Sequence, residues 1–210
     1  GVGVVFANTT TTLPAFADVL TDSKVLIGAV SSVWAGGWLL PQIFAAHYLS
    51  NKPRKYPIML KWQLIGRPVF PLFVVWLLLG GAQFPELTIA LFLLALTFFM
   101  STDALVALAF LDLFGKAMPA DRRGRLIGVG QVVTGVGALA AGWGIRQILG
   151  PAGPGFPMNY ALIFGLASLF FAISTIGCAL IVEAPEAVEA KRPSLREYVP
   201  QLGRLWRTDR

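Results

Sequence analysis

Two apolar stretches joined by a short basic turn constrain this chain more than any other feature. Residues 25–49 contain no charged side chain. At about 1.5 Å of rise per residue, a helix of that length covers a hydrocarbon core of about 30 Å. The turn at 50–55 holds three basic residues and Pro53, and residues 56–80 form a second apolar stretch. Because proline opposes helix continuation and cytoplasmic loops are rich in lysine and arginine, the pattern predicts two transmembrane helices joined by a cytoplasmic turn.

The rest of the sequence repeats this alternation of apolar spans and short connections. Apolar residues make up 56% of the 210 residues and charged residues only 13%, with a mean hydropathy of +0.69. That is more apolar material than one soluble core of this size needs. We predict an all-α membrane protein whose six transmembrane helices form one bundle over residues 1–182. The predicted helices span 1–19, 25–49, 56–80, 87–114, 126–149 and 159–182.

The charged residues predict how this bundle is oriented. Most of the 17 lysines and arginines fall in the 50–55 turn, in the 115–125 connection or after residue 190. The connections at 80–86 and 150–158 carry no positive charge, as external loops should. We therefore expect an integral protein of the cell (inner) membrane with both ends in the cytoplasm. The net charge of +6 does not indicate nucleic-acid binding, because the cations lie in connections instead of covering one face.

The sequence also predicts structural features at its two ends. Residues 183–210 are charged and predict a cytoplasmic linker. Ser194-Leu195-Arg196-Glu197 matches a capping box, and apolar residues follow at helical spacing. We predict a short amphipathic helix on the membrane surface there, although Pro200 opposes it. The sequence begins at Gly1 directly in apolar residues, so we expect it to start inside the first helix.

Polar side chains inside the predicted helices are the candidates for function. Asn8 precedes four threonines, Thr9 to Thr12, in the first span. Such threonines can bond to their own backbone and bend a helix, but a patch of this size should partly face water or protein. Arg67 and Asp103 lie near the midpoints of the third and fourth spans. A charge at that depth needs a partner or water, so a structural ion pair and a transport role for Asp103 are both open.

Two of the predicted helices carry small residues at every fourth position, which places them on one helix face and permits close approach of another helix. Helices two and five share this feature, which indicates two related three-helix units. The rows are Gly28, Ser32 and Gly36 in the second helix, and Gly130, Thr134, Ala138 and Gly142 in the fifth.

The sequence Ala46-His47-Tyr48-Leu49-Ser50-Asn51-Lys52-Pro53-Arg54-Lys55 resembles the major facilitator superfamily signature between helices two and three, Gly-x-x-x-Asp-Arg-x-Gly-Arg-Arg. Arg54 and Lys55 match its final basic pair, whereas Ser50 replaces the aspartate. The loop at 119–124 and the glycine-rich fifth span also resemble that family. The resemblance covers the whole chain, as the amino-terminal six-helix half of a twelve-helix transporter.

The resemblance implies a secondary active transporter that moves a small solute by alternating access, with each half built of two inverted three-helix repeats. Its partners would be the lipid bilayer, a small-molecule substrate, the missing carboxy-terminal six-helix half and a coupling ion. The rows of small residues would pack and gate against that missing half. No cofactor and no metal are implied. The residues placed on the substrate pathway are Asn8, Thr9, Thr12 and Asp103.

Two other classes of function can be compared with transport. The sequence contains no His-Glu-x-x-His, no Gly-x-Ser-x-Gly and no phosphate-binding glycine loop, and it has one histidine and one cysteine. We therefore do not expect an enzyme. The alternative that stays open is a six-helix membrane subunit that anchors a soluble partner through its basic loops. Further apolar spans beyond Arg210 would favour the transporter, and a stop codon or a soluble domain would favour the subunit.

Overall fold

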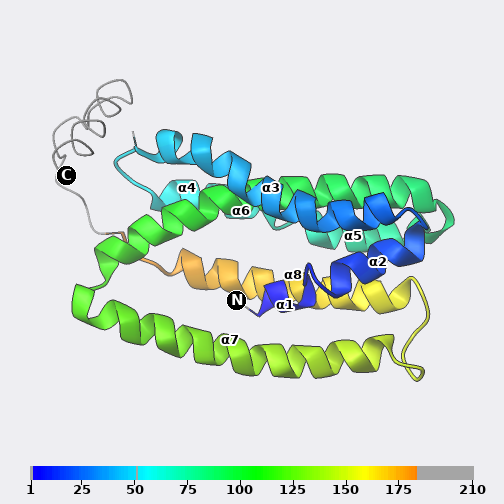
Figure 1. Ribbon diagram of the computed structural model, residues 1–210. Helices are drawn as coiled ribbons and strands as arrows, with labels where there is room; N and C mark the ends of the chain where they lie inside the picture. The colour runs from blue at the N-terminus through cyan, green and yellow to red at the C-terminus, as the bar shows by residue number, and fades with distance from the viewer. Residues whose placement is uncertain (1, 51, 184–210) are drawn as a thin grey trace, which may run out of the picture.

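The computed structural model describes residues 2–50 and 52–183, and the regular structure in this part of the chain is helical (Figure 1). Five stretches are long and apolar enough to cross a membrane, judged by length and composition. This confirms an all-helical chain with several candidate membrane spans. The stretches are α3 (Lys24–Ser50), α4 and α5 together (Tyr56–Gly66 and Val69–Leu78), α6 (Pro85–Ala117), α7 (Ala120–Leu149) and α8 (Met158–Ala179).

The first predicted span is broken in two. Instead of one helix over 1–19, the structure has α1 (Gly3–Phe6) and α2 (Thr12–Leu20). Between them the Asn8 carboxamide oxygen accepts hydrogen bonds from the Thr10 N–H, at 2.8 Å, and from the Thr10 hydroxyl, at 2.7 Å. Such local bonds compete with the regular backbone bonds of a helix. The prediction of one continuous first helix is therefore wrong, and we call residues 7–11 the helix break.

The third predicted span also has an interruption. α4 ends at Gly66, Arg67 and Pro68 follow, and α5 starts at Val69. Proline explains this interruption, because it lacks an N–H and its ring clashes with the preceding turn. At the same point α4 approaches α6 so closely that a Cβ on Gly66 would overlap the Thr102 hydroxyl and lie 2.9 Å from Thr102 Cβ. The interruption is thus held against the middle of α6.

The remaining boundaries differ from the predicted ones by a few residues. α6 continues without interruption through Asp103. α7 begins directly after Pro119, so the basic residues up to Arg125 lie on the helix and not in the connection before it. Gly80 lies beyond the end of α5 with a φ of +115°, a conformation that glycine adopts easily, and the short helix η1 (Gly81–Gln83) leads into α6.

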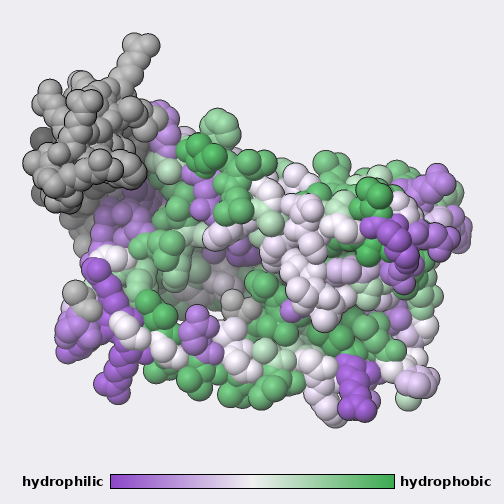
Figure 2. Space-filling model, in the orientation of Figure 1, coloured by the Kyte–Doolittle hydropathy of each residue, from purple (hydrophilic) through white to green (hydrophobic). Residues whose placement is uncertain are grey.

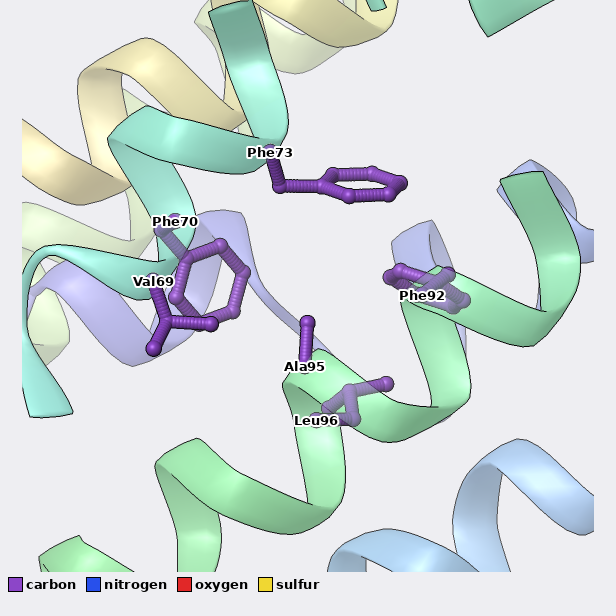
Figure 3. A pocket seen from close by; sticks show the side chains of 6 residues that line it. All are labelled: Val69, Phe70, Phe73, Phe92, Ala95 and Leu96. Atoms are coloured by element: carbon purple, nitrogen blue, oxygen red, sulfur yellow. The ribbon is translucent and has the colours of Figure 1, made fainter. Parts of the chain in front are cut away.

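An aromatic core lies between α2, α5, α6 and α8. Phe16 of α2 is fully buried, and its ring centroid lies 4.8 Å from that of Phe92 and 5.1 Å from that of Phe164. Figure 3 shows the α5–α6 side of this core, where six side chains surround a void of about 10 Å³: Val69, Phe70, Phe73, Phe92, Ala95 and Leu96. A void that is lined by apolar groups and barely large enough for one water molecule offers no site for a polar solute.

α7 stands apart from the other long helices for much of its length (Figure 1). Its second half packs on α1 and α8, where Ala141 is buried and Gly137 makes room for Val2. Its first half is separated from the rest by a hollow that Figure 2 shows. Many of its large apolar side chains are exposed, as they are on α3. Within the described residues, α3 and α7 therefore present the largest uncovered faces.

Candidate functional site

Polar side chains gather at two places near the middle depth of the helices. α2 has 9 residues, so the helix break lies about 13 Å from the end where α2 meets α3. Arg67 lies between the 11 residues of α4 and the 10 residues of α5, and Asp103 lies near the middle of the 33-residue α6. Arg67 and Asp103 therefore lie near the middle of two stretches that are long and apolar enough to cross a membrane, where a charge is most costly in lipid.

The helix break presents its polar groups at the surface of this bundle. Asn8 and Thr9 are half-buried, and Thr10 and Thr11 are exposed. A hydrogen bond joins the break to α3, because the Ser31 hydroxyl donates to the Thr9 carbonyl at 3.1 Å. The arrangement therefore offers hydroxyl, amide and backbone groups to whatever covers this face, and all of them are uncharged.

Thr12 differs from the threonines before it. It begins α2, its exposed fraction is 2%, and its hydroxyl has no hydrogen-bond partner among the described residues. A solute at the bundle surface could reach Thr10 or Thr11 but not Thr12 in this conformation. The predicted pathway residues are thus divided, because Asn8 and Thr9 are accessible and Thr12 is not.

Arg67 and Asp103 form an ion pair, with Arg67 Nη2 at 2.8 Å from Asp103 Oδ1. The two side chains are 16% and 27% exposed. The guanidinium carbon also lies 5.1 Å from the ring centroid of Phe99 and 4.7 Å from that of Phe171, so both rings offer their π faces to the cation. The pair and the two rings together explain how α6 and α8 hold the cation that lies between α4 and α5.

Three buried polar atoms beside this ion pair have no hydrogen-bond partner among the described residues. They are Gln63 Oε1, Trp62 Nε1 and Arg67 Nε, and all three residues line the same small pocket as Asp103. The pocket has no room for a water molecule that could satisfy them. Sequence reasoning missed Gln63 and Trp62. The signal was present for Gln63, because it precedes Arg67 by four residues and so lies on the same helix face.

The helix break and the ion pair are separate sites. Phe171 of α8 lies over Arg67, and the edge of the same ring packs against Gly3 of α1, where a Cβ would come within 2.9 Å of it. Among the described residues, Asp103 makes no hydrogen bond or ion pair with Asn8, Thr9 or Thr12. The four residues that the resemblance places on one pathway therefore do not form one cluster, and Asp103 belongs with Arg67.

The basic turn between α3 and α4 is closed by Lys55. This lysine is only 8% exposed, and its ammonium group donates to the carbonyl oxygens of Leu49, in the last turn of α3, and of Lys52, just beyond that helix. Arg123 acts similarly after α6, since its guanidinium donates to the carbonyls of Gly115 and Met118. Cations near a helix C-terminus are favourable for this reason. The Lys55 side chain therefore stabilises the turn and does not point into solvent.

The other residues of the signature turn have less defined positions. Arg54 is exposed, and Ser50 is the last residue of α3, although its side chain lies outside what the structure describes. Asn51 lies outside the described residues as well. Of the two signature side chains that the structure describes, Arg54 and Lys55, Lys55 is the one to which it assigns contacts in this turn.

Glu183 fastens the end of α8 to the start of α4. Its carboxylate accepts hydrogen bonds from the backbone N–H of Lys55, at 2.9 Å, and of Tyr56, at 3.0 Å. The Tyr56 hydroxyl donates to the Ala179 carbonyl at 2.7 Å. Tyr56 therefore provides a second contact between the start of α4 and the end of α8. Residues 184–210, with the predicted amphipathic helix, lie outside the described part of the chain.

Glu183→Ala should lower the free energy of unfolding by about 1–2 kcal/mol, because no side chain in α4 itself caps that helix and a negative group is favourable at a helix N-terminus. Chemical denaturation of the full-length protein in detergent would measure this. Glu183→Gln, which keeps one acceptor oxygen without the charge, should lose less. Equal stability of the alanine variant and the native protein would contradict the capping role.

Within the described residues, the glycines of the predicted small-residue rows do not pack against other helices. A Cβ added at Gly28, Gly36, Gly130 or Gly142 would meet no described atom within 4 Å. Ser32 is exposed, and Thr134 and Ala138 are half-buried. The close contacts are made by other glycines that the spacing rule did not select: Gly37 against Met100, Gly66 against Thr102 and Gly137 against Val2. The rows therefore lie on the uncovered faces of α3 and α7.

Comparison of the chain with protein-family models, with curated proteins and with solved structures gave no match. Within the described residues, no group of three His, Cys, Asp or Glu side chains is arranged to hold a metal ion. The function must therefore be argued from the polar residues at mid-span and from the faces that this chain leaves uncovered.

Proposed function

We propose that this chain is the amino-terminal half of a secondary active transporter, which moves a small solute by alternating access in the arrangement of the major facilitator superfamily. The helix break is the observation that carries the proposal. Non-helical backbone at membrane depth is tolerated only where protein buries it or where it lines a water-filled cavity. Thr10 and Thr11 are exposed on this bundle. We therefore infer that water or another protein segment, and not lipid, lies next to this face. Interrupted helices at the bilayer midplane are typical of solute sites in transporters.

The uncovered faces of α3 and α7 support the presence of a second bundle. Both helices carry a row of small residues with open space beside it and large apolar side chains around it. Small residues allow helices to approach closely, and exposed rows of them are suited to a sliding contact. A second six-helix half would cover both faces and enclose the helix break. The appearance of this feature in helices two and five is consistent with two inverted three-helix repeats.

The membrane placement follows from the same proposal. The turns closed by Lys55 and Arg123 would face the cytoplasm, together with both chain ends, because basic connections favour that side. The solute would then reach the helix break alternately from the cytoplasmic side and from the external side of the bilayer. Its uncharged hydrogen-bonding groups favour a solute that carries hydroxyl, amide or similar polar groups.

Thr11→Cys tests the proposal without knowledge of the substrate. In the full-length protein with Cys178 replaced by serine, this cysteine should react with a charged, membrane-impermeant thiol reagent, because such a reagent follows water and not lipid. Leu169→Cys is the matched control. Leu169 is also exposed and lies near the middle of α8, but its neighbours are apolar, so it should stay unreactive.

A Thr11→Cys protein that resists the reagent from both sides would argue against a solute route at the helix break. A positive control is Glu86→Cys, because Glu86 is exposed in the first turn of α6 and should react in every case. If Glu86→Cys reacts and Thr11→Cys does not, the break is covered by protein, and the membrane-subunit alternative gains support.

A further inference from the structure

A groove lies between the end of α2, the start of α3 and the start of α6, and we call it the α2–α6 groove. Its volume is about 410 Å³, which is within the range of pockets that hold small ligands. Figure 1 shows the α2–α3 connection and the start of α6 at the same end of the bundle, with the α3–α4 turn at the opposite end. The groove therefore lies at the end away from the basic turn that Lys55 closes.

The groove is polar at one end and apolar along the rest of its length. Its polar residues are Thr21, which follows α2, and Glu86, in the first turn of α6. Leu93 lies about two turns further along α6, or about 10 Å deeper in the bundle. The remaining lining residues are apolar: Leu20, Leu26, Ile89 and Ala90. A matching ligand has a polar group at the end of the bundle and an apolar part that extends toward the middle.

The polar end of the groove carries negative charge. Glu86 is exposed and forms no ion pair among the described residues, and the same holds for Asp22, which follows Thr21. Lys24, in the first turn of α3, is already paired with Asp18 at 3.1 Å. Carboxylates accept hydrogen bonds and make their strongest ones with charged donors. The polar group that this end favours is therefore a cation with N–H donors.

A membrane lipid presents these two parts in the order that the groove requires. Its headgroup lies at the membrane surface and its acyl chains extend into the hydrocarbon core. Glu86 lies in the first turn of a helix that is long and apolar enough to cross a membrane, whereas Leu93 lies within that apolar stretch. A small soluble cation would use the polar end alone and leave the apolar part of the groove empty.

The groove lies on a different side of α3 from the row of small residues. Leu26 lines the groove, and Gly28 of the row follows it by two positions. Residues two positions apart on a helix do not share a face. A second bundle that packs on the row therefore does not have to cover the groove.

We propose that the α2–α6 groove binds a membrane lipid whose headgroup carries a primary ammonium group. The ammonium donates a hydrogen bond to the Glu86 carboxylate, and one acyl chain lies against Ile89, Ala90 and Leu93. The inference goes beyond the proposed transport function, because it requires only that the chain lies in a membrane.

Native mass spectrometry of the full-length protein in detergent tests the headgroup. The probes are phosphatidylethanolamine and phosphatidylglycerol with identical acyl chains, since the first has an ammonium group and the second has none. The first lipid bound should be phosphatidylethanolamine with a preference of about two- to fivefold, the range expected for one ion pair that water partly screens. Glu86→Gln should abolish most of this preference. Asp121→Asn is the matched control, because Asp121 is an exposed carboxylate in the first turn of α7, and it should keep the preference.

Ala90→Phe tests the apolar part of the groove. Ala90 is exposed and lines the groove, so a larger side chain there should take the place of the acyl chain and weaken the binding of both lipids. Ala172→Phe is the matched control. Ala172 is an exposed alanine of α8 that does not line the groove, so this variant should bind both lipids like the native protein.

The proposal is overturned if the native protein shows no preference for phosphatidylethanolamine, or if Glu86→Gln keeps the native preference. Unchanged binding of both lipids to Ala90→Phe would also overturn it. Tetraphenylphosphonium tests a soluble cation as the occupant, and binding of this cation that depends on Glu86, without a lipid preference, would replace the lipid with a solute. None of these outcomes depends on whether Thr11→Cys reacts, so failure of the lipid proposal and failure of the transport proposal are distinguishable.

Discussion

Arg67→Leu should lower the free energy of unfolding by about 3–5 kcal/mol. The change leaves the Asp103 carboxylate at mid-span without its counter-ion, which is 2.8 Å away in the native protein. It also removes the cation from between Phe99 and Phe171. Denaturation in detergent and the yield of folded protein would measure the loss.

A double substitution separates the pair from its surroundings. Arg67→Leu combined with Asp103→Leu removes both charges and should recover most of the stability, because a neutral, apolar contact of similar size often matches a buried ion pair. Arg67→Lys should give an intermediate result, since it keeps the charge but loses the planar group that stacks on the two rings. If the single and the double substitution were equally unstable, the cost would lie in packing and not in the stranded charge.

Gly66→Ala should destabilise the protein by about 3 kcal/mol, at the upper end for an added methyl group in a packed site. The new Cβ would overlap the Thr102 hydroxyl and lie 2.9 Å from Thr102 Cβ. Thr102 cannot easily rotate away, because its hydroxyl donates to the Phe99 carbonyl at 2.8 Å. α4 would have to move away from α6, which would also disturb Arg67 in the next position. Thermal unfolding of the purified variant would measure the effect.

Gly165→Ala is the matched control for this substitution. Gly165 lies in α8, and a Cβ there would meet no described atom within 4 Å. Alanine should therefore be neutral or stabilising by about 0.5–1 kcal/mol, because glycine loses more conformational freedom in a helix. Adding Thr102→Ala to Gly66→Ala should recover part of the stability by removing the overlapping hydroxyl. Equal stability of Gly66→Ala and Gly165→Ala would show that α4 and α6 are not in tight contact.

The sequence predicted the apolar spans correctly for most of the chain. α6 and α8 lie close to their predicted ranges, and the turn between α3 and α4 lies where the basic residues and Pro53 indicated. Arg67 and Asp103 could be recognised as possible partners, because both lie near mid-span on helices that follow one another. Each of these predictions depends on the preference of single residues for water or lipid, which can be read along the sequence without knowledge of the fold.

The tertiary structure alone decided which groups meet. It showed that Asn8 bonds to Thr10 and breaks the first helix, that Lys55 turns back onto α3, and that Gln63 shares a pocket with Arg67. It also placed the predicted small-residue rows on open faces and the close contacts at other glycines. The physical reason is that contacts depend on how each helix is rotated about its axis and where it crosses its neighbours. Those two properties follow from packing of the whole bundle and leave little trace in a local sequence pattern.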